Sequence, residues 1–199
     1  MKNYKSIIIT TGCLLVLGGC FNTDGSTPAT PTTNGSTPST QSKVFNNNLF
    51  AFNFPGDWDV IQPKDFTSEV PQETLVVVRN NIKNDTFTAN INVVRNALQK
   101  DISSLDYAKE ILNRQKTGLL DYRETKREIL PISIGGQNQE TYYVEFEARL
   151  NATEPVTKFS QTYAVKDKAG YIIMGSYSID EQSAVIDKIS SVVKSFKVS

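Results

Sequence analysis

Two segments in the second half of the chain have the pattern of β-hairpins, and they restrict the fold more than any other feature. Residues 123–134 and 140–150 flank Gly135-Gly136, a pair suited to the positive φ angles of a tight turn. Residues 156–166 are joined to residues 170–179 by a short turn in the same way. Because hairpins join antiparallel strands, these segments predict an antiparallel sheet.

Aromatic and branched residues predict further strands earlier in the chain. Phe50, Phe52 and Phe54 share one face of a strand that Pro55 ends, since proline has no N–H to donate to a sheet. The run Leu75–Arg79 suits an interior strand. Alternation predicts another strand with one solvated face; its apolar residues are Phe87, Ala89, Ile91 and Val93, and its polar residues are Thr88, Asn90 and Asn92.

Capping motifs predict two helices. Ser103 and Asp106 form a variant capping box that opens a helix through about Gly118. Ser178 and Glu181 are predicted to cap a closing helix, whose apolar positions are Val185, Ile189, Val192 and Phe196. The expected fold class is therefore α+β, an antiparallel β-sheet flanked by helices. A domain of about 157 residues can bury about two-thirds of its surface and needs neither a disulfide nor a metal to fold.

The N-terminus has the pattern of a secretory signal peptide. Lys2 and Lys5 precede a twelve-residue apolar segment, Ser6–Leu17. As a helix it spans only ~18 Å, which is short of the ~30 Å hydrocarbon core of a bilayer. This arrangement indicates a signal peptide at residues 1–19 and not a membrane span.

Leu17, Gly18 and Gly19 lie directly before Cys20, and this segment resembles the bacterial lipobox. The resemblance implies signal-peptidase recognition of Leu17, Gly18 and Gly19, cleavage after Gly19, and attachment of a diacylglycerol to the Cys20 thiol. Two or three acyl chains hold a protein at a membrane, since each buried methylene contributes ~0.8 kcal/mol. A plain secretory signal or a short uncleaved anchor are the alternatives.

Composition divides the remaining chain into a tether and one domain. Residues 20–42 hold the acceptor cysteine and a segment rich in Ser, Thr, Pro and Gly. Such a segment cannot bury enough apolar surface to offset its ordering entropy, so we expect a disordered linker. Residues 43–199 carry the alternating apolar pattern and form the predicted folded domain.

The segment Phe52-Asn53-Phe54-Pro55-Gly56-Asp57-Trp58 resembles the opening of PsbP-like α/β/α sandwich domains. The order of the predicted elements and the closing helix before Phe196 agree with it, so the resemblance covers nearly all of residues 43–199. It implies a compact, non-catalytic domain that docks on a larger partner. Some photosynthetic members are associated with metal ions through histidine, and this chain has no histidine, so that property is not carried over.

Composition excludes several chemistries. A chain without histidine cannot form a Ser-His-Asp triad or an HExxH zinc site. The cysteines are Cys13 and Cys20 alone, so no cysteine-ligated metal is expected in the domain. The carboxylate pairs Asp57/Asp59 and Glu145/Glu147 are assigned to a turn and to a solvated strand face. We therefore expect no catalytic residue, no cofactor and no metal site.

Charge and aromatic residues lead to the functional hypotheses. The chain has 21 basic and 21 acidic side chains, which gives no basic excess for nucleic acid. The mixed-charge segment Asp121–Glu128 is either a solvated strand or loop or a docking patch. The tyrosines are expected mainly in the core, with Tyr143 on the outward face as a candidate anchor for a partner. The favoured function is a membrane-anchored, extracytoplasmic module of the bacterial cell envelope that docks on a protein complex and is not an enzyme. Binding of a small ligand between sheet and helix is the alternative, and a carboxylate-based hydrolase is the third.

Overall fold

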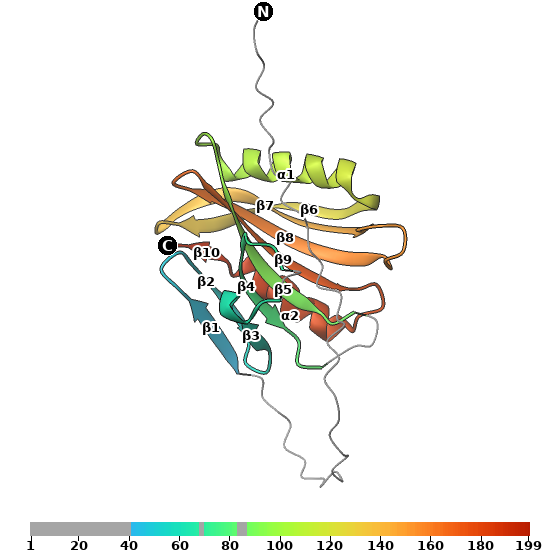
Figure 1. Ribbon diagram of the computed structural model, residues 1–199. Coiled ribbons are helices and arrows are strands. Elements are labelled where there is room, and N and C mark those ends of the chain that lie inside the picture. Colours follow the sequence, from blue (N-terminus) through green and yellow to red (C-terminus); the bar gives the residue numbers. More distant parts are fainter. Residues whose placement is uncertain (1–40, 68–69, 83–86) are drawn as a thin grey trace, which may run out of the picture.

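The computed structural model describes residues 41–67, 70–82 and 87–199. These residues form ten strands, two α-helices and one short 3-10 helix (Figure 1). In chain order the elements are β1 (Ser42–Asn46), β2 (Phe50–Pro55), β3 (Asp59–Ile61), η1 (Pro63–Asp65), β4 (Thr74–Arg79), β5 (Asn90–Ala97), α1 (Ser104–Gly118), β6 (Leu120–Ile134), β7 (Gln137–Arg149), β8 (Thr157–Lys166), β9 (Ala169–Ser178), α2 (Ser183–Lys194) and β10 (Lys197–Val198). Residues 20–40, which hold the predicted cysteine and most of the predicted linker of residues 20–42, lie outside the described residues. The last linker residue, Ser42, is already part of β1.

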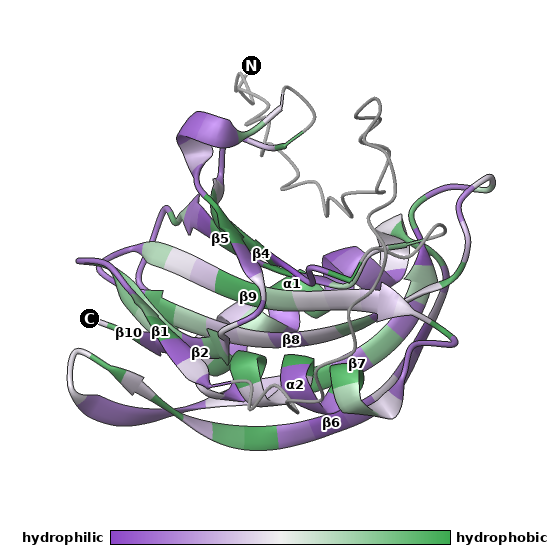
Figure 2. Cartoon of the chain, turned by 90° about the horizontal axis from the view of Figure 1, so that it is seen from below, coloured by the Kyte–Doolittle hydropathy of each residue, from purple (hydrophilic) through white to green (hydrophobic). Residues whose placement is uncertain are grey.

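All ten strands belong to one sheet, in the order β1-β2-β10-β6-β7-β8-β9-β5-β4-β3. Every neighbouring pair is antiparallel except β10 and β6, which are parallel. The sheet is strongly curved (Figure 2). The predicted hairpins are confirmed as β6–β7 and β8–β9.

The two helices pack on opposite faces of the middle strands. Helix α1 contacts β6, β7 and β8, whereas α2 contacts β2, β5, β8 and β9. Along β9, Tyr171 and Ile173 belong to the core on the α2 side, and Ile172 and Met174 belong to the core on the α1 side. Only two α-helices accompany the ten strands of the described residues. The chain is therefore mostly sheet, with more strand than the expected α/β/α sandwich implied.

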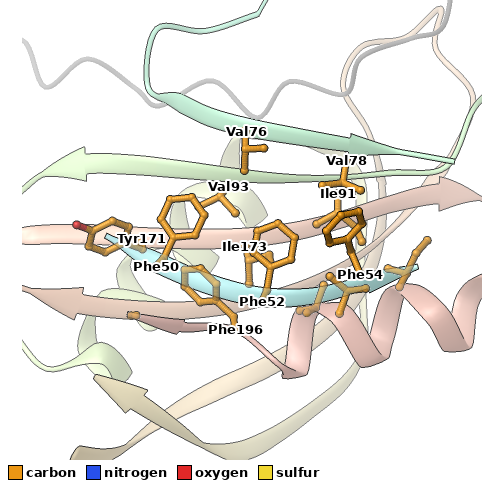
Figure 3. Packing of buried hydrophobic residues seen from close by; sticks show 14 of the residues in the cluster. Phe50, Phe52, Phe54, Val76, Val78, Ile91, Val93, Tyr171, Ile173 and Phe196 are labelled. Atoms are coloured by element: carbon orange, nitrogen blue, oxygen red, sulfur yellow. The ribbon is translucent and has the colours of Figure 1, made fainter. Parts of the chain in front are cut away.

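The larger core is built on the predicted aromatic strand (Figure 3). Phe50, Phe52 and Phe54 are all buried, and Trp58 is 4 % exposed beyond the turn that follows Pro55. Side chains of β4, β5, β9 and α2 complete this core. Its residues come from both ends of the domain, so the core joins the first strands to the closing helix.

Some of the predicted turns and helix caps are confirmed, and one cap is wrong. Gly135 and Gly136 have φ angles of 58° and 79°, as a tight turn requires. Ser103 caps α1 as predicted, with its hydroxyl accepting a hydrogen bond from the Asp106 N–H at 3.0 Å. The predicted cap of α2 is wrong: the helix begins at Ser183 after Gln182. Ser178 pairs with Thr157 in the sheet and cannot serve as a helix cap.

The predicted solvated face of the strand before α1 is also wrong. Asn90 and Asn92 are 2 % and 4 % exposed, because β5 lies between β4 and β9 and both of its faces are buried. The Oδ1 atoms of both side chains lack a hydrogen-bond partner within the described part of the chain. The alternation of apolar and polar residues identified the strand, but it could not show that the polar face of the strand is also buried.

Within residues 41–67, 70–82 and 87–199, neither helix combines the length and apolarity that a membrane crossing needs.

Substitution of Gly175 by alanine should destabilise the fold. An added Cβ would overlap Cγ2 of Ile189 on α2, and such overpacking costs about 2 kcal/mol of unfolding free energy. Urea denaturation of the two proteins measures this loss. Gly118→Ala is the matched control, because no atom lies within 4 Å of its added Cβ; an equal loss in both variants would contradict this packing.

Candidate interaction surface

The mixed-charge segment singled out in the sequence forms the first half of β6. This strand follows α1 directly, and Asp121 adopts a φ of 53° at the junction. The side chains of Arg123, Lys126 and Arg127 are 69 %, 44 % and 38 % exposed. The segment is therefore a charged strand at the surface, and we treat it as the candidate interaction surface.

A bulge decides which way the charged side chains of β6 point. The register with β7 shifts between Glu124 and Lys126, which leaves Thr125 as the extra residue. Because of this bulge, two side chains that are three residues apart and lie on either side of Thr125 share a face of the sheet. Tyr122, Glu124 and Arg127 lie on the α1 side of the sheet, and Arg123, Lys126 and Glu128 lie on the α2 side.

On the α1 side, β6 and the helix enclose a hollow of about 310 Å³. Leu112, Asn113 and Lys116 line it from α1, and Tyr122, Glu124 and Arg127 line it from β6. The Arg127 guanidinium donates two hydrogen bonds to Glu124, at 2.8 and 2.6 Å. It also lies 5.1 Å from the ring centre of Tyr142. Arg127 is thus held in place on one side by a carboxylate and on the other by an aromatic ring.

These contacts shift the titration of the hollow's side chains. Burial, together with the nearby Glu124 carboxylate, raises the pKa of Tyr122 to about 12. Hydrogen bonding to Glu124 raises the pKa of the Arg127 guanidinium above its ordinary value. Tyr122 therefore remains a neutral phenol and Arg127 remains a cation at neutral pH. The hollow can offer a cation, an amide and an aromatic edge to a partner.

On the α2 side, Tyr143 is the centre of a second cluster. The tyrosine is fully buried, so the prediction that it points outward as an anchor is wrong. Its hydroxyl lies 2.7 Å from Glu145 and 3.0 Å from Ser190 of α2. The Nζ of Lys194 lies 4.3 Å from its ring centre. The predicted buried face of β7, with Val144, Phe146 and Ala148, is confirmed. The error lies at Tyr143, because α2 also covers this part of the opposite face.

Glu128 links β6 to the end of α2. Its carboxylate lies 2.7 Å from Lys194 and 3.2 Å from Lys126. Hydrogen bonds from Lys194 and then Lys126 lower the pKa of Glu128 below its ordinary value of 4.5. The ion pairs of β6 thus form a network on both sides of the strand, which orders long charged side chains at the surface.

The outer edge of β6 is largely open. Strand β10 pairs with it at Ile134 alone, whereas β7 pairs with it along nearly its whole length. Among the described residues, no strand pairs with this edge from Leu120 to Ser133. Figure 2 shows β6 at the rim of the molecule.

The carboxylate pairs considered in the sequence are divided among separate partners. Asp57 lies 3.6 Å from Lys188, and Asp59 lies 3.9 Å from Arg79. Glu145 accepts from Tyr143, whereas Glu147 pairs with Arg123. In residues 41–67, 70–82 and 87–199, no three acidic or cysteine side chains come together as metal ligands. Leu17, Gly18, Gly19 and Cys20 lie outside the described residues.

Sequence reasoning missed the helix side of this surface. Asn113 and Lys116 are exposed on α1 and face the hollow, but nothing in their own pattern distinguishes them from ordinary solvated positions. The short distance in sequence between the end of α1 and β6 was the available signal. A helix that turns directly into a strand places its last turn beside that strand.

Comparisons with known proteins identify the fold. The family model described as PsbP matches residues 40–198, and the chain belongs to this family. The cyanobacterial PsbP (CyanoP) of Synechocystis sp. PCC 6803 has a similar structure, with 16 % identity, a TM-score of 0.54, and coverage of 84 % of this chain and 98 % of that chain. The Ran-binding protein Mog1p of Saccharomyces cerevisiae has 12 % identity, a TM-score of 0.54, and coverage of 79 % and 95 %. No curated protein matches the sequence.

Replacement of Lys194 by methionine should raise the pKa of Glu128 toward 4.5, because the variant removes the first of the two cations that hold it down. In the native protein, the stabilisation from Glu128 is complete above 4.5 and is lost as pH falls through its lowered folded-state pKa. Carbon-13 NMR of the side-chain carboxyl during an acid titration measures this pKa. Lys109→Met, which removes a partner of Asp106 on α1, is the control and should leave Glu128 unchanged. An unchanged Glu128 in the Lys194 variant would show that the contact does not form in solution.

Proposed function

We propose that this protein is a lipid-anchored, extracytoplasmic accessory module of the bacterial cell envelope that docks on a membrane-associated complex and stabilises it. The observation that carries the proposal is the ordered, charged surface of β6 beside the hollow at α1. The contacts of its tyrosine, arginine and carboxylate side chains are structural, so the role proposed is binding and not turnover of a substrate.

The side chains of this surface suit recognition of another protein. Arginine and tyrosine are frequent in the central residues of interfaces. Arg127 is fixed between Glu124 and the Tyr142 ring before any partner binds, so less side-chain entropy is lost on association. Alternating charges along β6 would favour a partner with the complementary order of charges.

The family supports an accessory role. Mog1p, which has this fold, is described as a Ran-binding protein, so the fold is compatible with protein–protein recognition. Sequence identity of 12 % transfers the fold alone. The β6 surface is therefore argued from this chain's own residues.

The proposed location depends on the N-terminal sequence. Cys20 is the proposed lipid attachment site, with Leu17, Gly18 and Gly19 as the recognition residues of the signal peptidase. The mature chain would carry an excess of two acidic side chains once Lys2 and Lys5 are removed. Such a chain is not attracted to anionic lipid by charge, so the acyl chains would provide the attachment and residues 21–42 the spacer.

Binding of a small ligand is the second proposal, and one observation favours it. Below α1, the side-chain amide of Gln115 donates to Gln161 at 3.1 Å, while the Oε1 of Gln115 has no partner in the described chain. The hollow nearby, however, is lined largely by charged and polar side chains, whereas small-molecule sites are mostly apolar. Docking of a protein therefore fits this surface better.

Lipid attachment is tested by metabolic labelling with a radioactive or clickable fatty acid. The native chain should be labelled and should fractionate with membranes, whereas Cys20→Ser should lose the label, because only the thiol forms the thioether. Cys13→Ser is the control and should be labelled normally. Label on the Cys20 variant would refute attachment at this residue.

Docking is tested by placing a photo-crosslinking amino acid at Asn113, which is exposed in the hollow. Irradiation of cells that make the full chain should yield one protein adduct of defined mass. The Lys116→Glu, Arg127→Glu double variant should reduce its yield about tenfold, which corresponds to a loss of about 1.4 kcal/mol. The same amino acid at Lys64 of η1 is the control position. Equal adducts at both positions, or an adduct insensitive to the charge changes, would refute docking here, and a lipid-sized adduct would favour the ligand proposal.

A further inference from the structure

The open edge of β6 presents backbone groups that no described strand uses. Between Leu120 and Ser133, the partner strand β7 occupies one edge and the other edge is unpaired. An unpaired edge of this length is a template for another strand. Proteins usually block such an edge with bulges or charges, and β6 has both.

The charges of β6 alternate in sign, so they exclude most strands but not all of them. A strand that opposes like charges is repelled, and a strand that opposes unlike charges is attracted. A strand that pairs here must therefore carry the opposite order of charges. A second copy of β6 has such an order, because in an antiparallel pair it presents the same residues in the reverse direction.

The bulge at Thr125 determines which self-pairings keep side chains on their own face. With the two-fold axis between Thr125 and Lys126, Arg123 lies opposite the second copy's Glu128, and both are on the α2 side. Glu124 lies opposite the second copy's Arg127, and both are on the α1 side. Each pair occurs twice, and all four unite unlike charges.

Neighbouring registers lack this match. Moving the second strand by two residues in one direction brings Arg123 opposite Lys126, which repel each other. Moving it in the other direction brings Arg123 opposite Leu130 and Glu124 opposite Ile129, which leaves the charges without partners. One register is therefore selected by charge, as strand pairing in general requires for a unique product.

The same register covers an exposed apolar side chain. Ile129 is 59 % exposed in the single chain. In the matched register it lies opposite the second copy's Tyr122, and both side chains are on the α1 side. Apolar and aromatic cross-strand pairs stabilise a sheet.

We propose that two copies of this chain associate through β6, antiparallel and about a two-fold axis at the Thr125 bulge. The charged side chains are already ordered by intramolecular partners, Glu147 for Arg123 and Lys194 for Glu128, so pairing extends existing networks. The association goes beyond the docking function, because it pairs the backbone edge of β6. Arg127 belongs to both surfaces, whereas Arg123 and Glu128 pair across the edge and do not line the hollow, so they separate the two proposals.

Sedimentation equilibrium of the full-length protein in mild detergent tests the pairing. The native chain should change from the mass of one copy to that of two as its concentration rises. Arg123→Glu and Glu128→Arg should each raise the dissociation constant about tenfold or more, because each places like charges opposite one another twice. The double variant R123E/E128R should return to within about threefold of the native value, since the exchanged charges are again opposite and unlike.

Lys109→Glu on α1 is the matched control; it reverses the charge of an exposed ion pair away from β6 and should leave association unchanged. Circular dichroism shows whether each variant is folded. A single-copy mass for the native chain at every concentration would overturn the proposal. So would a double variant that stays as weak as the single ones, because rescue is specific to this register. The Arg123 and Glu128 variants leave the lining of the hollow unchanged. Cross-linking at Asn113 in these two variants therefore separates a failure of self-association from a failure of docking.

Discussion

Burial of both faces of the middle strands is the constraint on which the rest of this structure depends. The side chains of β9 alternate between two cores, and each core is closed by a different helix. One helix could not bury both faces of a sheet, because successive side chains point in opposite directions. The position of α1 on one side and α2 on the other is therefore required by the apolar runs of β8 and β9, and it leaves β6 at the outside.

The position of β6 explains why a single strand carries the candidate surface. Its last residues, Ile132 and Ile134, are buried in the larger core, whereas its first residues extend past that core. The apolar end holds the strand in the sheet, and the charged end is available to other molecules. The residues that stabilise the fold and the residues of the proposed interaction surface therefore lie at opposite ends of one strand.

Local patterns predicted the elements that local physics determines. The Gly135-Gly136 turn, the Ser103 cap and the Phe50–Pro55 strand each depend on residues close in sequence, and each is confirmed. The errors at Asn90, Tyr143 and Ser178 have a common cause: burial and pairing depend on strands and helices distant in sequence. The two-residue strand β10 was missed because its place is decided by β2 and β6 on either side of it. For the same reason the charged segment Asp121–Glu128 was noticed, but its bulge, its hollow and its open edge were not.

The place where the described chain begins has a mechanical consequence. Residue 41 leads directly into β1, an edge strand with mostly exposed side chains that pairs only with β2. The C-terminus, by contrast, is held inside the sheet, where the Ser199 N–H donates to Leu49. Tension applied from the N-terminal side would therefore load the five-residue pairing of β1 with β2 first. Separation of β1 would lengthen the chain before residue 47 and would remove one ring, Phe45, from its contacts with Phe50 and Phe52.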